Sequence, residues 1–225
     1  MGSIPSSAMG RPRTPKGRAV ETERRLAEEY PDAVCELDFD TPFELLAATI
    51  LSAQCTDQRV NMVTPVLFRR YPTPEALAVA DSAELEEIIR PTGFFHNKAK
   101  SLVGMASALV ERFDSEVPGA MEDLVTVPGV GRKTANVVRS VALDLPGLPV
   151  DTHVLRLSRR LGLTTQSDPV KVERELNSMI PPAKRGTFSL RLILHGRRVC
   201  IARSPRCADC VLNDFCPASS VKVSR

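Results

Sequence analysis

The chain has 225 residues, which suffices for one compact domain or two small ones. Hydrophobic residues make up 43% and charged residues 25%, as in ordinary globular proteins, but aromatic residues only 4%, so aliphatic side chains must build the core. The sequence holds no apolar run near the roughly 18 residues that cross a bilayer, and no charged-then-apolar leader with a small-residue cleavage site. We therefore expect a cytoplasmic protein that does not span a membrane.

The two ends of the chain differ in charge from its middle, although the net charge is only +3. Residues 1–20 contain four basic and no acidic residues, and residues 184–225 contain nine basic against two acidic residues. Local positive charge is what a polyanion recognises, but runs of charge are also common on ordinary solvated surface. Because the chain starts with many Ser, Gly and Pro residues, we expect residues 1–15 to form a flexible leader.

Hydrophobic periodicity predicts helices along most of the chain. Thr41 and Pro42 supply an N-cap and a first-turn signal, and apolar residues then recur at three- and four-residue spacing up to Leu51. The same spacing predicts further helices at about 60–67, 85–89, 99–113, 120–126, 132–144, 152–162, 169–179 and 186–199. No segment alternates polar and apolar residues between turn signals, so the predicted class is all-α.

A glycine hairpin is predicted where residues 124–136 read Leu-Val-Thr-Val-Pro-Gly-Val-Gly-Arg-Lys-Thr-Ala-Asn. One helix should end at Pro128 and Gly129, and the next should begin after Gly131. Glycines permit positive φ and close approach, so backbone N–H groups at the start of the second helix can face an anion such as a DNA phosphate. A tight corner between packed helices is the alternative. The complete Pro-Gly-Val-Gly-Arg-Lys string favours the phosphate contact over that corner.

Four of the six cysteines fall close together near the C-terminus in the pattern Cys-x6-Cys-x2-Cys-x5-Cys. In an intracellular protein, four thiols at this spacing indicate a metal centre rather than two disulfides. Tetrahedral sulfur ligation suits either zinc or an iron–sulfur cluster, and the ligand type alone does not separate them. The predicted metal ligands are Cys200, Cys207, Cys210 and Cys216.

Together these motifs resemble those of the endonuclease III family of helix-hairpin-helix DNA glycosylases, over residues 16–217. The hairpin is similar to the family's own, Leu51-Ser-Ala-Gln-Cys-Thr-Asp57 to its Gln-bearing loop, Val150-Asp-Thr-His-Val154 to its catalytic Asp segment, and the cysteine pattern to its [4Fe-4S] loop. The resemblance implies a two-lobed helix-hairpin-helix fold with a bound [4Fe-4S] cluster. It places a six-helix domain at 35–145 and a cluster domain at 16–34 and 146–220.

The resemblance also implies the activity, that of a bifunctional DNA glycosylase and abasic-site lyase. Lys133 would attack the sugar of a damaged, extruded nucleotide, form a Schiff base and allow strand cleavage by β-elimination. A lysine is nucleophilic only when uncharged, and we expect burial and the positive end of the second helix to favour that form. The alternative is that Lys133 serves only as a phosphate-binding cation.

Asp151 precedes an apolar-periodic helix, so its simplest assignment is an N-cap that accepts a backbone N–H. The resemblance implies that Asp151 also assists proton transfer and stabilises positive charge on the sugar. His153, which lies beside it in sequence, would help to shape the pocket, although a lone histidine is more often a packed or capping residue.

Extrusion of a nucleotide leaves a gap in the duplex that the enzyme has to fill. By the resemblance, Gln54 fills this gap and hydrogen-bonds the stranded partner base. Gly93 is followed by Phe94 and Phe95, and we expect Phe94 to act as a wedge between base steps, with core packing as the alternative for Phe95. The expected contacts to DNA are completed by the hairpin residues Gly129, Val130, Gly131, Arg132 and Thr134.

The expected partner is double-stranded DNA that contains a damaged base or an abasic site, bound by a monomer in a prokaryotic, nucleoid-associated setting. Oxidised pyrimidines are the expected lesions. Two other functions fit part of the sequence. A monofunctional mismatch glycosylase of the same fold would not need Lys133, and a non-enzymatic DNA-binding module would leave Gln54 and Asp151 without a role.

Overall fold

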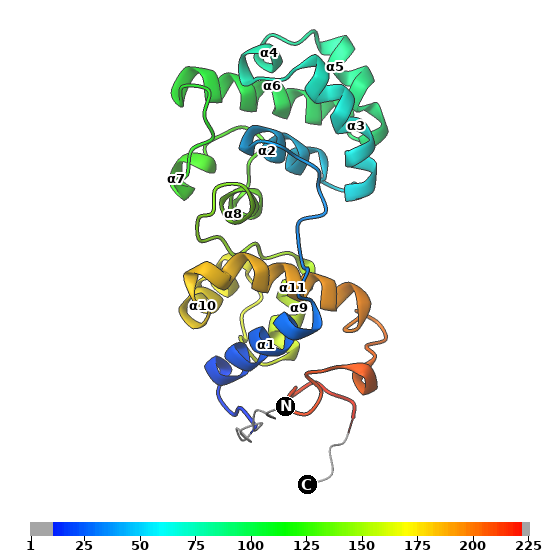
Figure 1. Cartoon of the computed structure of the whole chain (residues 1–225), viewed down its shortest axis with the longest axis vertical. Helices are drawn as coiled ribbons and strands as arrows, with labels where there is room; N and C mark the ends of the chain where they lie inside the picture. Colours follow the sequence, from blue (N-terminus) through cyan, green and yellow to red (C-terminus); the bar gives the residue numbers. More distant parts are fainter. Residues whose placement is uncertain (1–10, 222–225) are drawn as a thin grey trace, which may run out of the picture. The chain divides into compact units, whose positions relative to one another are not determined.

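The computed structural model describes residues 11–221 and divides into two compact units (Figure 1). One unit is the continuous segment Val34–Pro149, and the other is made from the chain on either side of it. Residues 11–221 contain helices and no strand, so the predicted all-α class is confirmed. Within these residues, no helix is long and apolar enough to cross a membrane.

The expected leader falls partly outside the described residues, which begin at Arg11. Its last residue belongs to a helix instead, because α1 (Pro15–Glu29) starts there. The Thr14 side chain accepts a hydrogen bond from the Gly17 N–H, and Pro15 occupies the first helical position, where its missing N–H costs nothing.

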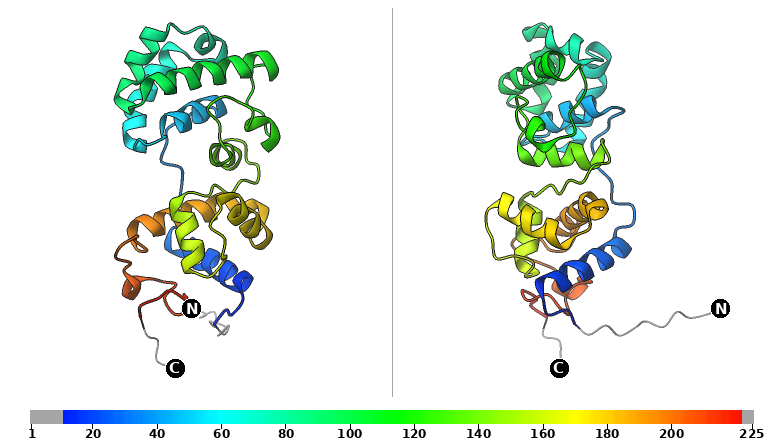
Figure 2. Two further views of the ribbon diagram at one scale, coloured as in Figure 1. Left: turned by 180° about the vertical axis from the view of Figure 1, so that it is seen from behind. Right: turned by 90° about the vertical axis from the view of Figure 1, so that its left-hand side faces the viewer.

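The continuous unit contains seven α-helical segments, two of which are only about one turn long. They are α2 (Pro42–Leu51), α3 (Asp57–Arg70), α4 (Pro74–Ala78), α5 (Ser82–Ile89), α6 (Phe95–Arg112), α7 (Met121–Leu124) and α8 (Arg132–Val141), with a 3-10 turn η1 (Arg90–Thr92). Helix α6 packs against α2, α4 and α5, and α2 also packs against α8. Figure 2 shows α6 as the long helix of this unit.

Capping side chains set where several of these helices begin. Thr41, Thr56, Thr73 and Asp81 each accept a hydrogen bond from an N–H in the first turn of the following helix. The apolar faces then meet in one core, in which Leu46, Leu102 and Met105 are fully buried. Burial of such aliphatic side chains stabilises the unit in the absence of Trp.

The unit built from both chain ends holds α1 together with α9 (Thr152–Arg160), α10 (Pro169–Met179), α11 (Arg185–Arg198) and the 3-10 turns η2 (Pro182–Lys184) and η3 (Cys207–Asp209). Helix α11 packs against α9 and α1, and α1 also packs against α10. The cysteine loop follows α11 and is drawn in orange and red in Figure 1.

Ion pairs tie α1 to the C-terminal part of this unit. The buried Glu23 carboxylate accepts from Lys184 Nζ at 2.8 Å and lies 3.6 Å from Arg191 Nη1. Arg25 Nη1 contacts the Asp214 carboxylate at 2.6 Å, and its guanidinium lies over the Phe215 ring. Removal of one partner from a half-buried ion pair costs more free energy of unfolding than removal from an exposed pair. These contacts therefore hold α1 on η2, on α11 and on the cysteine loop.

Candidate active site

The glycine hairpin forms as predicted in outline, with α7 and α8 joined by a turn. Gly129 has a φ of +78°, and a Cβ atom at this position would lie 2.8 Å from Ser101 Cβ. Gly131 is the N-cap of α8 with a φ of −88°, and a Cβ atom there would meet nothing within 4 Å. Gly129 is therefore required by the fold, whereas Gly131 leaves open space in front of a helix N-terminus.

The N-cap of α8 is a glycine, which has no side chain to hydrogen-bond the N–H groups of the first turn. The N-terminus of a helix carries partial positive charge and N–H groups without intrahelical partners, so it suits an anion. Val130 is buried, and its N–H already donates to Val127 O at 3.1 Å. Arg132 is exposed and Thr134 is half-buried beside this N-terminus.

Lys133 lies in the first turn of α8 and is exposed, so the burial that we expected from the sequence is not found. The packed face of α8 is formed by Ala135, Asn136 and Val138 instead. Asn136 fixes this face, because its Oδ1 accepts from the Leu148 N–H at 3.1 Å. We expected burial and the positive end of α8 to favour the uncharged amine. In the protein without DNA, of these two influences only the positive end of α8 acts on Lys133.

Gln54 and Phe94 line one pocket of the continuous unit together with Gly129. Both have left-handed backbone, with φ of 55° at Gln54 and 49° at Phe94, a conformation that costs a non-glycine residue about 1–3 kcal/mol. Phe94 is 66% exposed, whereas Phe95 packs against the core, so the structure distinguishes the two phenylalanines. An exposed aromatic side chain on strained backbone is not explained by packing.

Three further residues line this pocket that the sequence reasoning missed: Asn97, Lys98 and Ser101. All three lie on α6, one face of which was assigned to the core by periodicity. Lys98 is buried, with 5% of its surface exposed, and burial lowers the pKa of its ammonium. The sequence did contain one signal for Lys98. A cation is disfavoured near the N-terminus of a helix, so a lysine at the start of the predicted helix needed an explanation.

Asp151 belongs to the other unit and is the N-cap of α9, as its simplest assignment predicted. Its Oδ1 accepts from the Val154 N–H at 2.8 Å, and the side chain is half-buried. His153 is half-buried, with Nδ1 3.1 Å from Arg156 Nη2. Burial lowers the pKa of His153, while the Asp151 carboxylate acts in the opposite direction, so the imidazole is neutral near pH 7.

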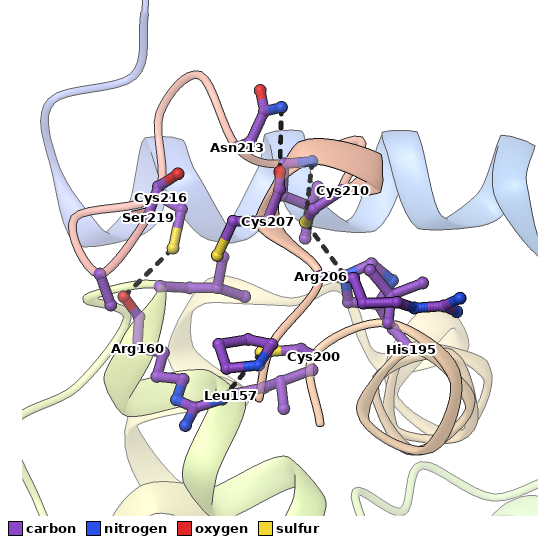
Figure 3. A pocket seen from close by; sticks show the side chains of 15 residues that line it. Leu157, Arg160, His195, Cys200, Arg206, Cys207, Cys210, Asn213, Cys216 and Ser219 are labelled. Atoms are coloured by element: carbon purple, nitrogen blue, oxygen red, sulfur yellow. Dashed lines mark hydrogen bonds between the residues drawn. The ribbon is translucent and has the colours of Figure 1, made fainter. Parts of the chain in front are cut away.

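The four predicted metal ligands line one cavity in the unit built from both chain ends (Figure 3). Within residues 11–221, no three His, Cys, Asp or Glu side chains lie close enough to hold a single metal ion. The four cysteines line this one cavity, and four cysteine sulfurs are a donor set that iron–sulfur clusters use.

Polar contacts to the sulfurs support the same fit. Arg160 Nη1 donates to Cys200 Sγ at 3.3 Å, and the Leu212 N–H donates to Cys210 Sγ at 3.4 Å. His195 Nε2 lies 3.3 Å from the same Cys210 sulfur. Donors of this kind stabilise negative charge on ligand sulfurs.

Burial raises the pKa of the Cys210 thiol to about 11 and raises the pKa of Cys216 as well. These thiols are therefore protonated in the chain alone, and metal binding has to displace their protons. The cost of burying thiolates is then recovered from the metal–sulfur bonds, which couples cluster binding to the fold of this loop.

A helical chain with a glycine hairpin at a helix N-terminus and a four-cysteine loop has the features of a helix-hairpin-helix DNA-repair protein. The family model described as HhH-GPD superfamily base excision DNA repair protein matches residues 47–182. A second model, the iron–sulfur binding domain of endonuclease III, matches residues 200–216 and so includes all four cysteines.

Individual relatives agree with these matches. The endonuclease III of Synechocystis is 54% identical over 95% of this chain and 98% of its own length. A solved non-covalent endonuclease III–DNA complex superposes with a TM-score of 0.84 at 42% identity, over 90% of this chain and 95% of its own. A trapped endonuclease III–DNA covalent intermediate gives the same TM-score at 43% identity, over 90% and 96% of the two chains.

The chain belongs to the endonuclease III family of base excision repair proteins. It is an enzyme, a DNA glycosylase with abasic-site lyase activity, and it carries a [4Fe-4S] cluster. The predictions of the family, the activity and the cofactor are thereby confirmed. Neither alternative function, the monofunctional mismatch glycosylase or the non-enzymatic DNA-binding module, agrees with these relatives.

The two hairpin glycines should respond differently to alanine. Gly129→Ala forces a Cβ into left-handed backbone and against Ser101, so we expect the free energy of unfolding to fall by roughly 1–3 kcal/mol. Gly131→Ala adds a methyl group in open space and should stay within about 0.5 kcal/mol of the wild type. Chemical denaturation of both variants measures this difference, and equal losses would contradict the assignment.

The cysteine assignment predicts that Cys210→Ser lowers the bound iron and sulfide and the visible absorbance of the purified protein. Cys55→Ser is the matched control, because Cys55 packs against the core of the other unit and should leave all three measurements unchanged. Stoichiometric zinc in colourless wild-type protein would refute the cluster.

Proposed function

We propose that this enzyme removes oxidised pyrimidines from duplex DNA and cleaves the strand at the resulting abasic site, with Lys133 as the nucleophile. The single observation that carries the proposal is the position of Lys133. Its amine is exposed in the first turn of a helix whose N-terminus is uncapped and fronted by the open space at Gly131. An amine placed beside a bound phosphate is also close to the sugar that the phosphate carries.

The reaction starts from the uncharged amine. Lys133 Nζ forms a bond to C1′ of the extruded nucleotide, the bond from C1′ to the base breaks, and the base leaves with the electron pair and takes up a proton. The sugar ring opens to a protonated Schiff base. Loss of a proton from C2′ then allows the C3′–O bond to break, and water hydrolyses the Schiff base to release the enzyme.

Asp151 would stabilise the positive charge that develops on the sugar and assist the proton transfers. Its N-cap contact uses one carboxylate oxygen, Oδ1, and fixes the direction of the side chain. Lys133 belongs to the continuous unit and Asp151 to the unit built from both chain ends. His153, two residues further on, would help to shape the surroundings of the Asp151 carboxylate.

DNA would be held at several places. The N-terminus of α8, with Gly131, Arg132 and Thr134, would bind a phosphate without reading sequence. Gln54 would fill the gap in the duplex and Phe94 would wedge between base steps. Both relatives with solved structures named above were studied with DNA, which supports this arrangement.

The cluster loop would add a further basic surface. The [4Fe-4S] cluster, held by the four cysteines, fixes a loop flanked by the exposed arginines Arg197, Arg198, Arg203 and Arg206. Positive charge fixed in this way strengthens contact with phosphates and makes it salt-dependent. We propose that the enzyme acts as a monomer on nucleoid DNA in the bacterial cytoplasm, as the bacterial origin of its relatives supports.

Borohydride reduction of a Schiff base should trap the enzyme covalently on duplexes that contain an oxidised pyrimidine or an abasic site. Lys133→Ala should abolish trapping because the attacking nitrogen is lost. Lys133→Arg should bind abasic duplex nearly as the wild type does, yet not be trapped, since a guanidinium keeps the cation but is never neutral in proteins. Lys171→Ala, an exposed lysine on α10, is the control. Trapping of either Lys133 variant would refute the nucleophile.

Asp151→Asn separates the chemical role of this residue from its structural one. Asn caps helices as well as Asp does, so the α9 cap should survive, whereas base release should slow by about 10²–10⁴-fold. Asp168→Asn is a matched control, because Asp168 caps α10 through the Lys171 N–H at 2.9 Å in the same unit. Single-turnover base release and thermal unfolding measure both effects. Equal rates for the two variants would leave Asp151 only its structural role.

A further inference from the structure

The buried Lys98 side chain, near the start of α6, hydrogen-bonds the C-terminal ends of α2 and η1. Lys98 is the fourth residue of α6, and its Nζ donates to Leu51 O and to Thr92 O, both at 2.8 Å. Leu51 is the last residue of α2, and Thr92 is the last residue of η1. Carbonyl groups at helix C-termini lack intrahelical partners and carry partial negative charge, so the ammonium satisfies one such group in each segment.

This position is an unfavourable one for a lysine. Burial disfavours the ammonium, and so does the positive end of α6 close to it. Burial is the main cause that lowers the pKa of the Lys98 ammonium. An apolar side chain of similar length would pack there without this cost, but it would leave both carbonyl groups without their donor.

The two carbonyl groups lie at the bases of the two loops that carry the proposed DNA-inserting side chains. Leu51 precedes Gln54 by three residues, and Thr92 precedes Phe94 by two. Both loop residues are exposed and have left-handed backbone, and both line one pocket with Lys98. Strained residues persist only where their surroundings hold them. Among the residues 11–221 that line this pocket, the Lys98 ammonium hydrogen-bonds the bases of both loops.

We propose that Lys98 is a positioning residue that sets the spacing between Gln54 and Phe94, so that both side chains enter the duplex together when the nucleotide is extruded. Lys98 acts through the two loops, while the reaction with the sugar is carried out at Lys133. The proposal rests on the proposed function, because it assumes that Gln54 and Phe94 insert into DNA.

The effect should appear in extrusion rather than in folding. Lys98→Met keeps the length of the side chain and removes the donor, so single-turnover base release from a duplex with an oxidised pyrimidine should fall roughly 10- to 100-fold. With 2-aminopurine as the partner base of an abasic site, the rise in fluorescence that reports its unstacking on enzyme binding should be reduced in parallel. Lys98→Arg restores charge and donors and should recover most of both signals.

Lys100→Met is the matched control, an exposed lysine on the same helix that should behave as the wild type. If Lys98→Met does not reach the wild-type helical content by circular dichroism, Lys98→Leu, which likewise has neither charge nor donor, replaces it with the same two measurements. Wild-type fluorescence in the donor-less variant would overturn the proposal, whether or not base release fell.

Failure of the proposed function gives a different result. If borohydride does not trap the wild-type enzyme, Lys133 is refuted as the nucleophile. The fluorescence comparison would still test the positioning role of Lys98, because it requires DNA binding and not the reaction. Wild-type enzyme that is trapped, with no difference between the Lys98 and Lys100 variants, would refute only the positioning role.

Discussion

The close packing around Gly129 is the constraint on which the candidate active site depends. Gly129 has left-handed backbone, and α8 begins three residues later at Arg132. A Cβ atom at Gly129 would be crowded by Ser101 of α6 and by Ile50 of α2. The hairpin is thereby fixed against the same two helices that lead to Gln54 and from Phe94. Lys133, the open helix N-terminus and the two strained loop residues consequently share one rigid support, as a site that must hold distorted DNA requires.

Local sequence signals were enough to predict most of this framework. Thr41 with Pro42, and Asp168 with Pro169, begin α2 and α10 where capping rules place them. Helix ends were less accurate. The helix expected at 132–144 stops at Val141, and Asp144 has positive φ, while the one expected at 120–126 is a single turn, because the chain has to bend toward Gly129. The hairpin and the metal-binding cysteines were predicted from residue type and spacing, whereas the roles of Lys133, Asp151 and Gln54 came from the resemblance, because no periodicity encodes that chemistry.

The rest could not be predicted, because it depends on contacts between residues far apart in sequence. Periodicity treats Phe94 and Phe95 alike, yet one is exposed and the other packs against the core. The exposure of Lys133 follows from which face of α8 meets the core. Lys98 hydrogen-bonds a carbonyl group 47 residues away, a contact that the sequence does not reveal. The only local sign was its unfavourable place, as a cation, near the N-terminus of α6.

The pairing of the two chain ends has a consequence for how the protein is made on the ribosome. Glu23 is synthesised early, but its partner Lys184 follows 161 residues later, whereas the segment Val34–Pro149 is continuous and finds its contacts within itself. The segments that cover the apolar face of α1, among them α11, are therefore synthesised long after α1 itself. During translation, the segment Val34–Pro149 is synthesised before the four cysteines of the C-terminal loop, so the cluster can be inserted only after that unit has been made.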